Sequence, residues 1–205
     1  MFTYLKRSMI LVIPATIVFL CFTPYRKRAL SAMKLKSSLR REIALILFVM
    51  SIFAILEVTL EPAYIWQQDE NAIWGNINIA ILRPTWDFNL SLMPFTEFKN
   101  YIDGLTQGPA MFFLTLLNFF GNLFVFVPIG LFPALLFRNA TWKRSFAVGF
   151  GMSLFIEVSQ YFICRNVAVD DLILNTLGAM FGYLIYLFLK KHWPKFTDSF
   201  LCQRQ

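Results

Sequence analysis

The chain has 205 residues, of which 58% are hydrophobic and only 15% are charged. Soluble domains average about 25% charged residues, so this composition excludes an ordinary water-soluble domain. The formal net charge of +7 lies in short basic clusters between long apolar runs, a pattern that orients membrane proteins, and we expect no nucleic-acid partner.

Five apolar segments are long enough to cross the hydrocarbon core, which needs about 20 mostly apolar residues per helix. The first, 8–23, is short and contains Pro14, but no small-residue cleavage site follows it, so we predict a spanning helix. The second, 43–60, ends before Pro62, because proline cannot continue a helix. The remaining segments are 111–137, 145–163 and 172–189. The sequence therefore predicts an all-α fold, a polytopic transmembrane bundle of about five helices.

These segments divide the chain into four regions. Residues 1–42 hold the first span and a basic loop, and residues 43–110 hold the second span and a long loop. Residues 111–189 form a core of three helices, and residues 190–205 form a basic tail. The long loop is rich in tryptophan, whose amphipathic ring favours the headgroup level of a bilayer. We therefore predict that this loop lies on the membrane surface.

The orientation follows from the distribution of positive charge, because short loops rich in Lys and Arg stay in the cytoplasm. Of the 19 Lys and Arg residues, 14 fall in the first loop, the loop between the third and fourth spans, and the tail, and five fall on the other side. This predicts an outer N-terminus and a cytoplasmic C-terminus. Of the three cysteines, Cys164 alone then faces outward, so no disulfide is expected between it and Cys21 or Cys202.

Polar side chains recur at matching depth in the last three spans. An ionisable group in the middle of a transmembrane helix costs about 2.5 to 3.5 kcal/mol on insertion scales, so it needs a partner or a task. We expect these groups to converge at the outer face, joined there by Glu57 of the second span as a further candidate. The predicted ligand-binding residues are Asn118, Asn122, Glu157, Gln160, Arg165, Asp170, Asp171 and Asn175. The backbone break expected at Pro128 and the small residues Gly178 and Gly182 shape the same core.

The order of these residues resembles the VanZ-like family of bacterial membrane proteins. One part of the matching string is carried by Asn118, Asn122, Phe126, Pro128 and Gly130, the next by Ser153, Glu157 and Gln160, and the last by Arg165, Asp170, Asp171, Asn175, Gly178 and Gly182. Upstream, Asn89-Leu90 followed by Pro94-Phe95 is similar to the family's Asn-Leu-x-Pro-Phe segment, with two residues inserted. The resemblance covers about half the chain, residues 89–189. It implies a bacterial plasma-membrane location and a link to reduced susceptibility to glycopeptide antibiotics such as teicoplanin.

Four functional readings stay open at this point. The polar set can act as hydrogen-bonding glue between helices, with Asp170 or Asp171 capping a helix start. It can bind an amphiphilic ligand, such as a lipid-linked cell-wall precursor or a lipoglycopeptide, among the membrane lipids. It can form an enzyme site in which Glu157 and Asp170 or Asp171 act as acid and base or as metal ligands, although no metal or cofactor is assigned. A transporter is the least favoured, because one polar site offers no route to the other face.

Overall fold

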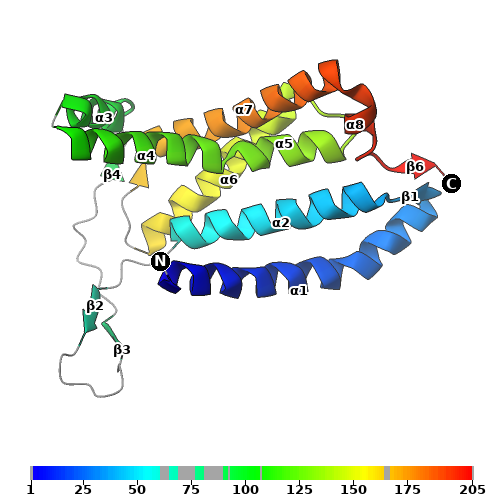
Figure 1. Cartoon of the computed structure of the whole chain (residues 1–205), viewed down its shortest axis with the longest axis horizontal. Coiled ribbons are helices and arrows are strands. Elements are labelled where there is room, and N and C mark those ends of the chain that lie inside the picture. The colour runs from blue at the N-terminus through cyan, green and yellow to red at the C-terminus, as the bar shows by residue number, and fades with distance from the viewer. Residues whose placement is uncertain are drawn as a thin grey trace.

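The computed structural model of the chain describes residues 2–60, 65–68, 77–80, 90–91, 93–106, 108–163 and 167–204. Within them there are five long helical stretches, most of which run along the longest axis of the molecule, while α6 crosses it obliquely (Figure 1). These are α1 (Phe2–Ala32), α2 (Leu39–Leu60), α4 (Pro109–Val125) with its continuation α5 (Val127–Leu136), α6 (Trp142–Phe162) and α7 (Val169–His192). The predicted all-α helix bundle is confirmed.

Three stretches among the described residues are long and apolar enough to cross a membrane: Leu39–Leu60, Met111–Leu136 and Val169–His192. They correspond to the second, third and fifth predicted spans. The first and fourth predicted spans lie within α1 and α6, which pack beside them (Figure 1). The exact number of spans and the inside–outside orientation stay predictions.

Two helical features differ from the sequence expectation. Helix α1 continues to Ala32, beyond the predicted end of the first span, because the basic residues that follow are good helix formers. A short amphipathic helix, α3 (Thr96–Thr106), lies inside the segment that was expected to be a loop. By contrast, the break expected at Pro128 is confirmed, since the third span divides at Phe126 into α4 and α5.

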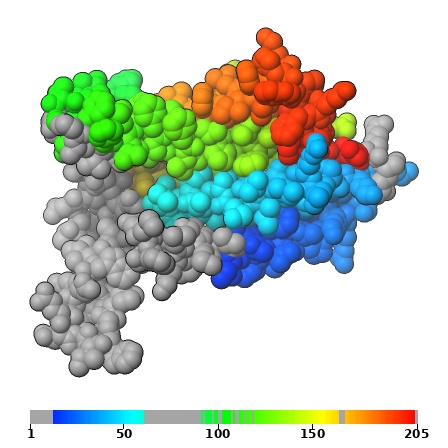
Figure 2. All heavy atoms as spheres, viewed as in Figure 1, coloured from blue at the N-terminus to red at the C-terminus, as the bar shows by residue number. Residues whose placement is uncertain are grey.

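Short strands pair near both ends of the bundle. Strand β4 (Leu90–Ser91) runs parallel to β5 (Val167–Ala168), and β1 (Leu35–Lys36) runs antiparallel to β6 (Gln203–Arg204). Strands β2 (Ile65–Gln68) and β3 (Ile77–Ala80) pair with each other. We call the end formed by α3, β4 and β5 the α3 end, and the end formed by β1, β6 and the short helix α8 (Pro194–Asp198) the tail end. Figure 2 shows α3 and the C-terminal tail on opposite ends of the molecule.

Glycines bring α7 against α4 and α5 without intervening side chains. A methyl group on Gly178 would overlap the carbonyl oxygen of Leu123, and one on Gly182 would overlap that of Val127. In the opposite direction, a methyl group on Gly130 would overlap the carbonyl oxygen of Ala179. Such close backbone approach is the usual role of small residues between membrane helices. The glycines of the VanZ-like string therefore fix the core that carries the polar site.

Arginine side chains hold the tail end together. Arg41 is buried and donates hydrogen bonds to the carbonyl oxygens of Leu136, at the end of α5, and Phe200, at 3.1 Å. Arg138 donates to the carbonyl oxygen of Cys202 at 3.0 Å. The tail that follows α7 is thus tied to α2 and to the end of α5.

Candidate functional site at the α3 end

Among the predicted site residues whose side chains the structure describes, Asp170 is the most buried, with 1% of its surface exposed. One carboxylate oxygen accepts a hydrogen bond from the backbone N–H of Phe95 at 2.6 Å, and the other accepts from that of Phe98 at 3.3 Å. Both amides lie at the start of α3, where helical N–H groups have no partner within the helix. Asp170 therefore caps α3, a helix about 70 residues earlier in the chain. At the start of its own helix, the N-cap of α7 is Ala168, whose side chain makes no capping hydrogen bond, and Asp170 and Asp171 lie in the first turn.

This contact also positions the segment that resembles the family's Asn-Leu-x-Pro-Phe motif. Leu90 and Ser91 pair with Val167 and Ala168, immediately before Asp170. Phe95 has a φ of 71°, in the left-handed region that non-glycine residues rarely adopt. The backbone turns there so that its N–H meets the Asp170 carboxylate. Despite the two extra residues relative to the family motif, this segment therefore contacts the polar site, through the pairing of Leu90 with Val167 and the bond from Phe95 to Asp170.

Two further predicted residues connect α7 to its neighbours. The side-chain amide of Asn122 donates to Asp171 at 3.0 Å and joins α4 to the start of α7. The side-chain amide of Asn175 donates to the hydroxyl of Ser153 at 3.0 Å, and both groups are buried between α6 and α7. These contacts are hydrogen bonds between helices, the structural role that one of the sequence-based interpretations expected for asparagine.

Glu157 combines burial with a place on a cavity wall. It is only 6% exposed, and one oxygen accepts the backbone N–H of Ala168 at 3.2 Å. The same residue lines a pocket of about 290 Å³ between the end of α6 and the start of α7. The rest of the described lining is apolar except for Tyr161, and includes Leu154, Val158 and Leu172. Glu157 is thus the one carboxylate among the described residues of this pocket.

Gln160 lies one turn after Glu157 on the same side of α6. Its side-chain N–H donates to the carbonyl oxygen of Thr59 at 3.0 Å, which joins α6 to the end of α2. Its Oε1 is buried and has no hydrogen-bond partner among the residues that the structure describes. A buried acceptor without a partner costs about 1 to 3 kcal/mol, so this atom is suited to receive a donor from water or a ligand.

Three other predicted residues are less fully placed. Arg165 lies in residues 164–166, outside the described part of the chain, and so does Cys164. The backbone of Asn118 lies in α4, but its side chain is not among those described. Glu57 is half buried on α2 and does not line the Glu157 pocket. Over the described residues, no group of three His, Cys, Asp or Glu side chains is arranged to hold a metal ion.

Sequence reasoning missed the groups that pair with the predicted residues. The partners of Asp170, Glu157 and Gln160 are backbone N–H and C=O groups, which every residue carries and no sequence pattern marks. Ser153 could have been found, because it stands in the string shared with the VanZ-like family, one turn before Glu157. The pocket itself depends on how the end of α6 meets β5, and this required the folded structure.

One comparison with known proteins found a match to this chain. The VanZ/LLP1 family model matches residues 42–190, which run from the first turn of α2 almost to the end of α7. The match extends upstream of the sequence string and includes α2 and α3. No curated protein and no solved structure matches the chain. Because the match spans more than half of the 205 residues and includes every element of the polar site, the chain belongs to the VanZ/LLP1 family.

Proposed function

We propose that this VanZ-like membrane protein binds an amphiphilic cell-envelope ligand at the α3 end of the bundle, beside Glu157. The observation that carries the proposal is a buried glutamate whose side chain lines an almost wholly apolar pocket. Ligand sites typically combine an apolar lining with a few polar groups that fix orientation. An apolar part of the ligand occupies the pocket, and its polar part faces Glu157.

The other predicted residues support this site as a scaffold. Asp170 holds α3, Asn122 holds the start of α7, and Asn175 holds α6 against α7. Their polar atoms are engaged with other parts of the protein, so they fit the glue reading better than direct ligand contact. Glu157 differs because it has both a structural bond, to Ala168, and a place on the cavity wall.

The size and charge of the pocket narrow the ligand class. A volume of about 290 Å³ lies at the lower limit for small-molecule sites, which span roughly 300 to 1,000 Å³. It accommodates one hydrophobic tail rather than a whole glycopeptide. A carboxylate accepts hydrogen bonds, so it favours ligand groups that donate them, such as sugar hydroxyls, peptide amides or an ammonium. A lipid-linked cell-wall precursor or the acyl part of a lipoglycopeptide meets both requirements.

The distribution of positive charge supports an outer location for this site. The tail end carries the basic loops and the basic tail, so the α3 end faces outward if the protein follows the usual rule. Exposed positions at both ends test this in a chain whose native cysteines are replaced by serine. We expect Asp103→Cys, in α3, to react with an impermeant maleimide on intact cells. Lys195→Cys, in α8, should react only after permeabilisation, and the reverse pattern would refute an outer site.

The binding test compares Glu157→Gln with Glu57→Gln. Glu57 is a second carboxylate at the α3 side of the bundle that does not line the pocket. Each protein is purified from its native membrane, and the amphiphiles that remain bound are identified by mass spectrometry. We expect the Glu157 variant to retain about tenfold less of one bound amphiphile than the Glu57 variant, because a hydrogen bond to a charged group contributes about 1.5 to 3 kcal/mol to binding. Equal retention in both variants would contradict the proposal.

A second pair of variants tests whether the ligand occupies the pocket, without changing the charge of Glu157. Val158 is exposed and lines the pocket, so Val158→Phe fills the cavity without disturbing the core. Val125→Phe is the matched control, because Val125 is an exposed residue of α4 outside this pocket. Val158→Phe alone should reduce retention of the same species. If that species is the target of a glycopeptide, the same variant should also raise susceptibility to teicoplanin at equal protein abundance.

An enzyme is the second candidate function. Asp171 lies close enough to Glu157 for the two carboxylates to interact electrostatically, and paired carboxylates can divide the roles of acid and base. Under this reading the retained species would be converted on prolonged incubation, and Asp171→Asn would stop conversion without preventing retention. Recovery of a chemically unchanged ligand favours the binding function.

A further inference from the structure

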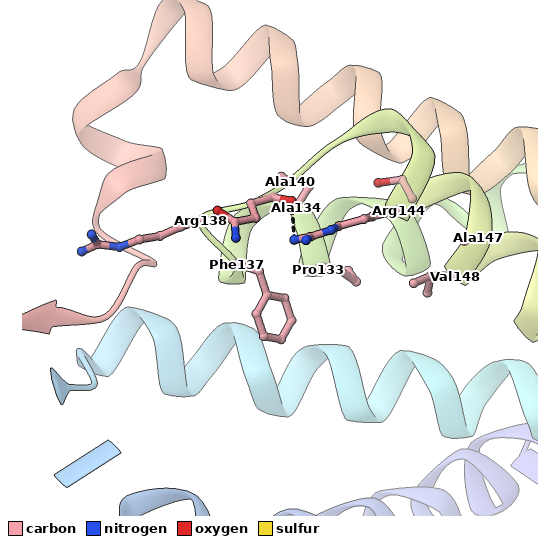
Figure 3. Close-up of a pocket in the computed structure, with 10 residues that line it drawn as sticks. Pro133, Ala134, Phe137, Arg138, Ala140, Arg144, Ala147 and Val148 are labelled. Atoms are coloured by element: carbon pink, nitrogen blue, oxygen red, sulfur yellow. Dashed lines mark hydrogen bonds between the residues drawn. The ribbon is translucent and has the colours of Figure 1, made fainter. Parts of the chain in front are cut away.

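A second pocket lies at the tail end, in the turn between α5 and α6. Its volume is about 430 Å³, larger than that of the Glu157 pocket. Apolar side chains line it, including Pro133 of α5, Phe137 directly after α5 and Val148 of α6 (Figure 3). Small residues, among them Ala134 and Ala147, leave the space open. The cavity is thus chemically suited to a hydrocarbon chain.

The rim of this pocket is strongly basic. Arg144 lines it and donates a hydrogen bond to the carbonyl oxygen of Asn139 at 2.7 Å, which holds the guanidinium beside the cavity (Figure 3). That bond uses part of the donor capacity of a group with five N–H donors, so further acceptors can be bound. Lys143 is exposed next to it, and Arg138 lines the pocket with its stem while its guanidinium extends toward the tail (Figure 3). No acidic residue occurs between positions 137 and 145.

Helix α6 adds to this positive potential. It begins at Trp142, so its N-terminal end, where the helix dipole is positive, lies at the pocket rim. The first turn of α6 contains no acidic residue that would compensate the dipole. Trp142 is 54% exposed, as expected for a ring at the headgroup level of a bilayer. Apolar walls, a basic rim and an interfacial tryptophan therefore meet at one place.

We propose that this tail-end pocket is a binding site for an anionic phospholipid of the leaflet at the tail end of the bundle, which is the cytoplasmic leaflet in the predicted orientation. One acyl chain occupies the space between α5 and α6, and the phosphate lies against Arg144 and the start of α6. Arginine suits this role because its planar fork can make two hydrogen bonds to one phosphate. A free phosphate would leave the apolar cavity unfilled, so the chemistry favours the lipid. The site lies at the opposite end from Glu157 and does not depend on the proposed function.

The test measures lipid binding to purified full-length protein by native mass spectrometry in detergent. Phosphatidylglycerol and phosphatidylcholine with identical acyl chains are added, and inorganic phosphate is added as a competitor. We expect one tightly held phosphatidylglycerol per protein, retained about tenfold better than phosphatidylcholine. Both lipids carry a phosphate, but the positive choline group of phosphatidylcholine is repelled by the basic rim around Arg144. Millimolar inorganic phosphate should not displace it.

Three variants locate the site. Arg144→Gln should abolish the preference for phosphatidylglycerol, and Ala147→Trp should displace the tightly held lipid of either kind, since Ala147 is exposed on the pocket wall. Arg28→Gln removes the same charge from an exposed position of α1 away from this pocket and should change neither. Glu157→Gln should also leave this lipid bound, which keeps the test independent of the outer site.

Three outcomes would overturn the inference. If Arg28→Gln reduces the preference as much as Arg144→Gln, the protein attracts anionic lipids by overall charge and has no defined site. If inorganic phosphate displaces the lipid completely, or if Ala147→Trp retains it, the apolar cavity plays no part in binding.

Discussion

The two ends of the bundle secure their peripheral segments with groups of opposite charge. At the α3 end, carboxylates accept hydrogen bonds from backbone N–H groups: Asp170 from the start of α3, and Glu157 from the residue before α7. At the tail end, arginines donate to backbone carbonyls: Arg41 to the end of α5 and Arg138 to the tail. Both arrangements match the helix dipole, which favours negative groups at helix starts and positive groups at helix ends. The fold therefore uses the same principle at the start of α3, through Asp170, and at the end of α5, through Arg41.

The largest effect is expected from removing the acceptor that holds α3. Asp170→Ala leaves the amides of Phe95 and Phe98 without their partner, and we expect a loss of about 3 kcal/mol in the free energy of unfolding. Hydrogen exchange at these two amides should accelerate before the rest of the bundle unfolds. Asp170→Asn, which keeps the volume and one acceptor, should lose less. Unchanged exchange in the alanine variant would show that α3 is held by other contacts.

A smaller effect is expected at the tail end. Arg41→Met retains an apolar stem but loses the donors to Leu136 and Phe200, and should cost about 2 kcal/mol. Arg40→Met is the matched control, because Arg40 is exposed and, among the described residues, its side chain donates to the Ser199 hydroxyl alone. Limited proteolysis after Trp193 measures release of the tail. Equal protection in both variants would mean that packing of the tail, and not the buried arginine, holds it.

The smallest effect is expected from the neutral pair in the interior. A double-mutant cycle with Asn175→Ala and Ser153→Ala should give a coupling energy of about 0.6 kcal/mol, and at most about 1.7 kcal/mol. The unfolding of all four proteins in mixed detergent provides the measurement. Ser159→Ala, which breaks only a bond within α6, should show no coupling to Asn175→Ala. A coupling energy of about 3 kcal/mol, as large as the loss expected for Asp170→Ala, would show that the neutral hydrogen bond in the interior contributes as much as the charged ones at the ends.

The sequence predicted the helices well because hydrophobic length is a direct requirement of the bilayer. It also predicted that Asn122, Asp171 and Glu157 lie in one region, since their positions follow from helical spacing and the depth of each span. It did not predict α3, which is short, only moderately apolar and capped by a residue far away in the chain. The sequence also did not predict the burial of Arg41, for a different reason. Loop arginines are normally read as orientation signals, and nothing in the sequence shows that this one reaches two backbone carbonyls.

The glycine contacts between α7 and the α4–α5 pair restrict how the bundle can move. Sliding α7 along its axis would bring other side chains, such as Leu174 or Tyr186, into positions where only a hydrogen atom fits. These helices therefore behave as one rigid unit. Helix α3 is held by Asp170 at its start and also packs along α4, where Phe98 contacts Phe119. Helix α1, which packs mainly on α2 at the periphery of the bundle, is therefore the long helix that these glycine contacts constrain least (Figure 1).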